Sequence, residues 1–420
     1  MKRICAALAA ISALGIAGSA RAAGYDTPML YSARHMGMGG AAIGYVHDPS
    51  AVFHNPAGLG QIERGEVLGD FSLLVGGIHA SPNGNATNID SKTTVAPFFL
   101  VGAGYRIQKL ITLGVAVYPI ASSGATFRFG ATEDRTQLLF LEASPAIAVN
   151  VLPNLRIGAG YRVTYVHLDR YEGNPGTAQT PVFDFQLSGS NFLGFRVGAE
   201  WSALPWLQFG VVFRNPTITK VTNSHGTALQ LAFNDVSTKF KLPAKLGAGT
   251  RADFDPFGVH GSLAADFEYN FNGENEGYPL IGTAPPDSDS PGVNQVSNVF
   301  EWSNSVTLKL GAEYRFLHSY ALDLDRIAVR AGYVYDSKAA NPAYPTAFGS
   351  PPGPSNIGTV GAGYNAGTWQ ANVAYAYRVG TGKVTQEGID NRAQTCQFCS
   401  AAGDYKIHLN GIYVDASYKF

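Results

Sequence analysis

The sequence is poor in charge and in cysteine, and its mature part contains no long hydrophobic run. Charged residues make up 15% of the 420 positions, whereas soluble domains usually carry about 25%. The formal net charge is −1, which argues against a nucleic-acid partner, because such a partner requires a basic face. Residues 23–420 contain no run of about 18 apolar residues, the length that a membrane-spanning helix needs. A membrane role would therefore require β-strands.

The amino terminus has the features of a secretory signal peptide. Lys2 and Arg3 precede an uncharged apolar run over residues 4–17, and small residues follow up to Ala20-Arg21-Ala22. This pattern predicts cleavage before Ala23, so that residues 1–22 leave the mature protein. The protein is therefore expected to be exported.

Only two of the three cysteines remain after this cleavage, because Cys5 lies in the signal peptide. Cys396 and Cys399 have the C-x-x-C spacing of redox motifs. In an extracellular loop of an exported protein, the same spacing favours a structural disulfide, and redox chemistry is the alternative.

No motif of the chain predicts an enzyme, a metal site or a cofactor. His47, Asp48 and Ser50 are residue types of a hydrolase, but three residues within four positions seldom reach the geometry of a catalytic triad. Residues 37–44 (GMGGAAIG) lack the Lys-Ser/Thr of a phosphate-binding loop and follow no predicted strand. Close packing or a hinge is the better interpretation of this run.

The carboxy-terminal residues alternate strictly between two faces. Ile412, Val414, Ala416, Tyr418 and Phe420 form the apolar face, and mostly polar residues lie between them. A closing strand of an outer-membrane barrel shows apolar side chains to lipid, polar ones to the lumen, and an aromatic residue at the headgroup boundary. The 49 glycines, 21 tyrosines and 24 phenylalanines fit such a barrel. A secreted, soluble all-β protein is the alternative.

Period-two segments recur fourteen times after residue 65. They cover residues 66–80, 93–106, 110–129, 135–151, 154–168, 190–203, 206–221, 237–253, 257–272, 299–316, 325–338, 356–366, 368–380 and 405–420. Short and long links alternate between them, as periplasmic turns and extracellular loops do in membrane barrels. We therefore predict an all-β fold, a 14-stranded antiparallel transmembrane barrel over residues 66–420. Its even strand count places both ends of the barrel on the periplasmic side.

Residues 23–65 do not have the pattern of a wall strand. They are rich in small residues and contain Asn55-Pro56-Ala57, which predicts a sharp bend because proline fixes its own φ and holds Asn55 extended. An ordinary Asx-Pro turn is the alternative. A barrel of this width needs a filled lumen to be closed, so we expect these residues to form a plug.

The amino-terminal motifs resemble the hatch of the FadL/TodX family of outer-membrane transporters. The shared features are a small Gly/Ala stretch at residues 39–43 and an Asn-Pro-Ala motif at Asn55-Pro56-Ala57, just before a fourteen-stranded barrel. Val95-Ala96-Pro97, Leu242-Pro243 and the terminal aromatic residue resemble it as well. The resemblance implies a monomer in the Gram-negative outer membrane that passively imports hydrophobic compounds. It further implies contacts with lipid and lipopolysaccharide, and recognition of the last strand by the barrel assembly machinery.

The third predicted strand is interrupted at Pro119 and again near Ser123 and Gly124. Proline cannot donate to a β-ladder and glycine weakens one, so a bulge or inward kink is expected here. The resemblance implies that this kink opens a lateral gap in the wall. A bulge without a gap is the alternative.

The residues that contact the ligand are expected on the plug and on two strands. They are Phe53 and His54 on the plug, Phe127 and Phe129 on the third strand, and Tyr165, His167 and Arg170 near the third long loop. Arg170 would bind a carboxylate, but whether the ligand is a fatty acid or an aromatic hydrocarbon stays open. A water-filled porin and a structural or adhesive barrel are the alternative functions.

Overall fold

The computed structural model describes residues 29, 31–82, 89–255, 260–275, 277–288, 291–297, 300–316, 326–340, 353–390 and 402–420. The signal peptide, Cys396 and Cys399 lie outside these residues. In the described part, no helix is both long and apolar enough to cross a membrane.

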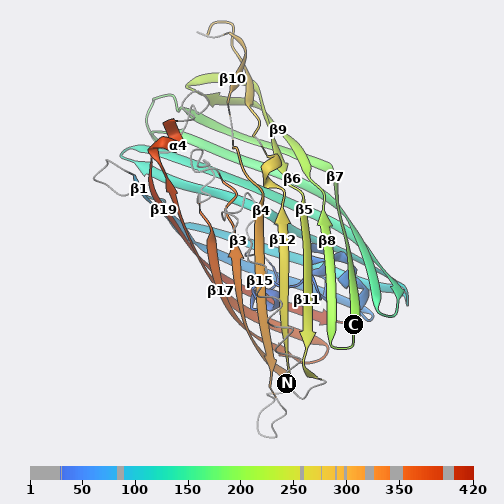
Figure 1. Ribbon diagram of the computed structural model, residues 1–420. Helices are drawn as coiled ribbons and strands as arrows, with labels where there is room; N and C mark the ends of the chain where they lie inside the picture. Colours follow the sequence, from blue (N-terminus) through green and yellow to red (C-terminus); the bar gives the residue numbers. More distant parts are fainter. Residues whose placement is uncertain are drawn as a thin grey trace.

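Fourteen strands pair side by side in antiparallel order and close into a ring (Figure 1). They are β1 (Gly65–Pro82), β3 (Thr94–Gln108), β4 (Ile111–Phe129), β5 (Thr132–Leu152), β6 (Leu155–Gly173), β7 (Phe183–Leu204), β8 (Leu207–Arg214), β11 (Lys245–Asp253), β12 (Gly261–Asn270), β15 (Ser305–Arg315), β16 (Ile327–Asp336), β17 (Ser355–Asn365), β18 (Trp369–Val384) and β19 (Gly403–Lys419). The ring closes where β19 pairs with β1, from Glu66 opposite Lys419 to Pro82 opposite Gly403. The prediction of a 14-stranded antiparallel barrel is confirmed.

The two strands predicted at residues 206–221 and 237–253 are each divided by a proline into a part within the ring and a part outside it. Pro216 separates β8 from β9 (Thr217–Ala228), and Pro243 separates β10 (Leu231–Leu242) from β11. Because proline lacks the N–H that a ladder needs, each strand is interrupted there, and its two parts pair with different neighbours. β9 and β10 pair with each other above the ring, at the end that carries the long loops (Figure 1).

Smaller elements complete the fold. They are β2 (Ile89–Asp90), β13 (Leu280–Ala284), β14 (Gly292–Val296), the 3₁₀ turn η3 (Asn272–Glu274) and α4 (Gln386–Asp390). β13 pairs with β10 and β14 with β13, which extends the sheet outside the ring.

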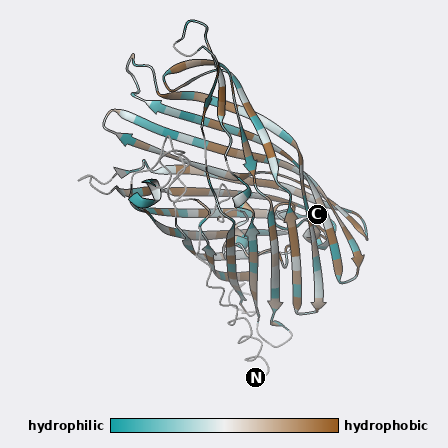
Figure 2. Ribbon diagram, turned by 45° about the horizontal axis from the view of Figure 1, so that its top comes forward, coloured by the Kyte–Doolittle hydropathy of each residue, from teal (hydrophilic) through white to brown (hydrophobic). Residues whose placement is uncertain are grey.

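Hydrophobic and hydrophilic residues alternate along many wall strands (Figure 2), and exposed and buried residues alternate along much of β3. On β3, Val95 and Val101 are each 59% exposed on the outside, whereas Phe98 and Leu100 point inward and are buried. Exposed aromatic residues cluster near the short turns, among them Trp201, Trp369 and Tyr418. An apolar outer wall with aromatic residues at its rim matches the surface that a lipid bilayer requires.

Candidate functional site

The N-terminal segment, residues 29 and 31–62, contains short helical turns joined by irregular backbone. They are α2 (Ala33–Met36), α3 (Ala51–His54) and the 3₁₀ turn η1 (Pro56–Gln61). Asn55 is extended and caps η1, since its side-chain oxygen accepts a hydrogen bond from the Ala57 amide at 3.2 Å. Its Nδ2 donates to Ile43 O at 3.0 Å and to Ala199 O of β7 at 3.1 Å. Asn55 thus folds the segment and joins it to the wall.

Carboxylates from strands on different sides of the ring bind the backbone of this segment. Asp70 of β1 accepts from Ala33 N at 3.1 Å, and Asp415 of β19 accepts from Arg34 N at 3.0 Å. Asp266 of β12 accepts from both Ala42 N and Ile43 N, at 2.7 and 2.9 Å. Glu200 of β7 accepts from Val46 N at 3.2 Å. Because the segment is largely non-helical, these backbone amides have no acceptor within it. The carboxylates of the wall supply the acceptors.

Glycines in the wall allow the segment to approach the strands closely. A Cβ on Gly210 of β8 would lie 1.9 Å from Ile43 O, and one on Gly198 of β7 would lie 2.0 Å from Asn55 Oδ1. Any side chain at either position would displace the segment.

β4 leaves its neighbour β3 at its midpoint. The two strands pair from Gln108 opposite Ile111 to Val101 opposite Val117, and no further. At the same place the register with β5 shifts between Pro119 and Ala121, which leaves Ile120 as a bulge. Residues 118–121 are all buried, so the usual alternation of exposed and buried residues stops here. Residues 94–100 of β3 and 118–125 of β4 still belong to ladders with β1 and β5, but they do not pair with each other. This part of the β3–β4 seam is called the unpaired stretch below.

Beyond the unpaired stretch, the chain just before β3 is hydrogen-bonded to β4 and β5. The Lys92 amide donates to Thr126 O at 2.7 Å, and Lys92 Nζ lies 2.7 Å from Glu133 of β5. The stretch is therefore bounded at both ends.

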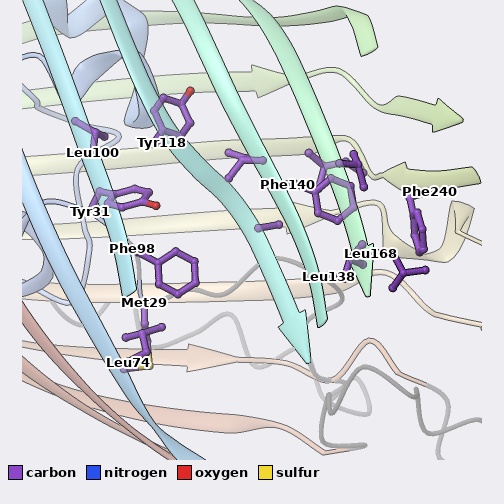
Figure 3. Packing of buried hydrophobic residues seen from close by; sticks show 14 of the residues in the cluster. Met29, Tyr31, Leu74, Phe98, Leu100, Tyr118, Leu138, Phe140, Leu168 and Phe240 are labelled. Atoms are coloured by element: carbon purple, nitrogen blue, oxygen red, sulfur yellow. The ribbon is translucent and has the colours of Figure 1, made fainter. Parts of the chain in front are cut away.

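Aromatic residues of the N-terminal segment lie behind the unpaired stretch. The Tyr31 hydroxyl donates to Pro119 O at 2.8 Å, and the Tyr31 ring is 6.0 Å from that of Tyr118 and 5.3 Å from that of Phe53. Phe98 of β3 belongs to the same buried cluster (Figure 3).

One apolar cluster extends from this point toward the long-loop end. It continues through Leu138 and Phe140 of β5 and Leu168 of β6 to Phe240 of β10 (Figure 3). Further members lie on the sheet outside the ring, including Phe233, Leu280 and Val296. The buried side chains of this cluster therefore form a continuous apolar lining of the inner wall from the loops down to the N-terminal segment.

A buried charged cluster lies beside the lower part of this lining. Glu142 of β5 accepts from Arg162 Nε of β6 at 2.7 Å and from the Tyr118 hydroxyl at 2.5 Å. Arg196 of β7 donates to Tyr118 Oη at 2.9 Å and to Val52 O at 2.6 Å. Arg162 is fully buried, and its Nη2 has no hydrogen-bond partner among the residues that the structure describes.

Glu142→Gln is expected to lower the free energy of unfolding by about 3–5 kcal/mol, because it leaves the buried Arg162 charge uncompensated. Glu133→Gln is the matched control, since the side chains of its partners Lys92 and Arg128 are 44% and 60% exposed. Its loss should cost about 1 kcal/mol or less. Denaturant titration of the folded barrel in detergent, followed by tryptophan fluorescence, measures both. Equal losses in the two variants would contradict the expectation.

The predicted residues of the N-terminal segment and of the third strand lie on two separate elements, α3 and β4. Phe53 packs against the apolar cluster, whereas His54 is buried within the N-terminal segment, with Nε2 2.9 Å from Tyr31 O. Burial and the nearby His35 lower the pKa of His54, so its ring is neutral and Nε2 donates. Phe127 is half-buried on β4, and Phe129 is the last residue of that strand.

The predicted residues on β6 do not share one face. Tyr165 is 40% exposed on the outer face, His167 lies on the same side two residues later, and Val166 and Leu168 point inward instead. Arg170 forms ion pairs with Asp134 and with Glu172 and lies over the Phe183 ring. Its charge is therefore already neutralised by two carboxylates.

Asp48 and Ser50, two of the residue types found in hydrolases, form a turn at the start of α3. Asp48 Oδ1 accepts from the Ser50 amide at 2.8 Å and from its hydroxyl at 2.5 Å, just before α3. Burial alone would raise the pKa of Asp48, but hydrogen bonding and charge from His35 lower it below its usual range. Among the described residues, no group of His, Cys, Asp or Glu could hold a metal ion.

A polar cavity of about 440 Å³ lies on the other side of the N-terminal segment, at the end with the short turns. Its charged lining consists of Arg34, Arg251, Arg315, Arg326, Arg330, Lys419, Asp253, Asp255 and Glu313. The two sides of the segment thus differ sharply in polarity.

Residues 13–420 match the family described as outer membrane protein transport protein (OMPP1/FadL/TodX). The chain belongs to this family. As a family member it is a transport barrel of the outer membrane, and the resemblance inferred from Asn55-Pro56-Ala57 is confirmed. No curated protein matches the chain significantly.

Solved structures show the same fold at low sequence identity. A Pseudomonas aeruginosa FadL homologue is 16% identical, with a TM-score of 0.72, over 95% of this chain and 100% of that one. The toluene transporter TodX of P. putida is 15% identical, with a TM-score of 0.69, over 94% of this chain and 99% of that one. The monoaromatic hydrocarbon channel CymD is 15% identical, with a TM-score of 0.64 and the same coverage. Identities this low extend the likeness to the fold alone.

Sequence reasoning missed the groups that hold the N-terminal segment. Asp70, Asp266 and Asp415 are inward positions of wall strands, and Tyr31 lies before the Gly/Ala stretch at residues 39–43. A carboxylate at an inward position of a lipid-facing strand was the available signal, since such a charge needs a partner in the lumen.

Proposed function

We propose that the protein passively imports hydrophobic compounds across the outer membrane, with the N-terminal segment as a plug and a sideways exit at the unpaired stretch. The observation that supports this most is the end of the β3–β4 ladder at Val101 and Val117, directly in front of the apolar cluster. A compound held in that cluster needs to pass only this part of the wall to reach lipid. The mechanism requires no catalytic group, so we propose a transporter and not an enzyme.

The polarity of the two possible exits favours the sideways route. Apolar surface gains about 0.8 kcal/mol for each CH₂ removed from water. Moving ten methylenes from the apolar cluster into the charged cavity at the short-turn end would therefore cost about 8 kcal/mol. Leaving sideways into lipid avoids this cost.

Contacts of the lumen argue against a water-filled porin. The N-terminal segment is hydrogen-bonded to β1, β7, β12 and β19, and the Glu142–Arg162 ion pair is fully buried. A diffusion pore needs an open path lined by hydrated charge.

The buried Arg162 supports a ligand that carries a carboxylate. Its unpartnered Nη2 lies beside the lower part of the apolar cluster, where it could donate to an oxyanion. Arg170 is less suited to this role because Asp134 and Glu172 already bind it. A long-chain fatty acid thus fits the lumen better than an aromatic hydrocarbon.

The function is tested by uptake into Gram-negative cells that lack transporters for hydrophobic compounds. Cells that express the protein should take up radiolabelled oleate about tenfold faster than cells with an empty vector. Methyl oleate should enter more slowly than oleate, since it has no charge for Arg162 to bind. A hydrophilic trisaccharide should enter no faster than in control cells.

Other outcomes have distinct meanings. Rapid entry of toluene without oleate would assign the aromatic hydrocarbon class. Entry of the trisaccharide would favour a porin, and no gain for either hydrophobic compound would refute the proposed function.

A further inference from the structure

We propose that Tyr31 is the residue that closes the sideways exit, and that it couples this exit to movement of the plug. The proposal rests on the proposed function, because it assigns a residue to the exit at the unpaired stretch. It concerns positioning and not recognition, since Tyr31 would act by holding the wall closed.

The first argument is the place of the Tyr31 hydroxyl. It donates to Pro119 O at 2.8 Å, and Pro119 lies two residues beyond the last β4 residue that pairs with β3. Tyr31 is 0% exposed, and its ring packs against that of Tyr118, the first residue of the unpaired stretch on β4. A side chain of the plug thus binds the wall where β3 no longer does.

The second argument is the connection from Tyr31 into the plug. Its carbonyl oxygen accepts a hydrogen bond from His54 Nε2 at 2.9 Å, and its ring meets Phe53 edge-on at 5.3 Å. His54 and Phe53 both belong to α3. A shift of α3 would therefore pull Tyr31 away from Pro119, which links plug movement to the exit.

The third argument is backbone strain. Tyr31 has a φ of +26°, which a residue with a side chain rarely adopts. Such a conformation persists only where neighbouring contacts impose it. Here the Tyr31 hydroxyl is held by Pro119 O at 2.8 Å, and the Tyr31 carbonyl oxygen by His54 Nε2 at 2.9 Å. Release of Tyr31 from Pro119 would relieve this strain and so favour the open state.

Tyr413 provides a matched control. It is also a fully buried tyrosine whose hydroxyl binds the backbone of the N-terminal segment. It lies on β19, however, which pairs with β1 and β18 and not with β4. Removing either hydroxyl takes one hydrogen bond from the plug, but only Tyr31 touches the edge of the exit.

Tyr31→Phe should raise the rate of oleate uptake about threefold to tenfold, the factor that corresponds to one buried hydrogen bond. Tyr413→Phe should leave uptake within twofold of wild type. Ion conductance in planar bilayers should stay low in both variants, because the plug remains in the lumen. A change in the heat-dependent gel mobility checks that each barrel is folded.

Equal uptake by both variants, or a rise of conductance along with uptake in Tyr31→Phe, would overturn the proposal, since either result means general loosening of the plug. Unchanged uptake in Tyr31→Phe, in cells where the wild-type protein transports oleate, would overturn it as well. Absence of uptake by the wild-type protein would instead refute the proposed function, and this assignment with it.

Discussion

Replacing Pro119 with valine and deleting Ile120 is expected to reduce oleate uptake to the level of cells without the protein. Ile120 is the bulged residue between the pairs Pro119–Leu141 and Ala121–Phe140. Its deletion gives β4 one residue for each residue of β5, and valine restores a backbone donor and β propensity at position 119. A straight β4 can then continue its ladder with β3 beyond Val117, which closes the unpaired stretch.

Gly124 is left unchanged in this variant for a structural reason. A Cβ at Gly124 would lie 2.4 Å from Thr136 O of β5, so a larger residue would disturb the pairing that must be preserved. Pro145→Val on β5 is the matched control, because it replaces an exposed wall proline that pairs with Val115, outside the unpaired stretch.

The control should transport oleate at the wild-type rate, and heat-dependent gel mobility should show that both barrels fold. If the Pro119/Ile120 variant assembles normally and still transports at the wild-type rate, the sideways exit is wrong. Passage through the plug into the periplasm would then be the better mechanism.

Removal of residues 24–60 is expected to raise ion conductance in planar bilayers from nearly zero to values typical of open pores. These residues include the atoms that Asp70, Asp266 and Glu200 bind, so without them the polar inner wall is exposed to water. Unchanged conductance would show that the segment does not block the lumen. The wild-type protein, measured in the same membranes, sets the baseline.

A single substitution tests the same point without removing the segment. Gly210→Ala places a Cβ 1.9 Å from Ile43 O, and neither backbone can yield without moving the strand or the plug. We expect frequent openings in single-channel recordings. Gly358→Ala on β17 is the control, since a Cβ there would have no atom within 4 Å and should leave conductance low. Similar recordings from both variants would contradict a close fit between plug and wall.

The strand pattern was largely predictable because it depends on local sequence. Alternation of apolar and polar residues decides which side chains face lipid, and the short and long links between segments decide how strands follow one another. The bulge at Pro119 was predictable for the same reason, because a proline interrupts a ladder wherever it lies. The alternation of apolar and polar residues was weaker in the parts of the strands near the long loops. Both faces of β6 carry large apolar or aromatic residues there, so Tyr165 and Val166 could not be assigned to their faces.

The sequence by itself thus determined the architecture, the family and the place where the wall is irregular. Only the tertiary structure decided which groups meet in the lumen: Tyr31 with Pro119, Asp266 with Ala42, and Arg162 with Glu142. Closing a ring brings together residues that are far apart in the chain, such as Ala42 and Asp266, which are 224 positions apart. Periodicity carries no information about such pairs, because it records only which way a side chain points and not what it meets across the lumen.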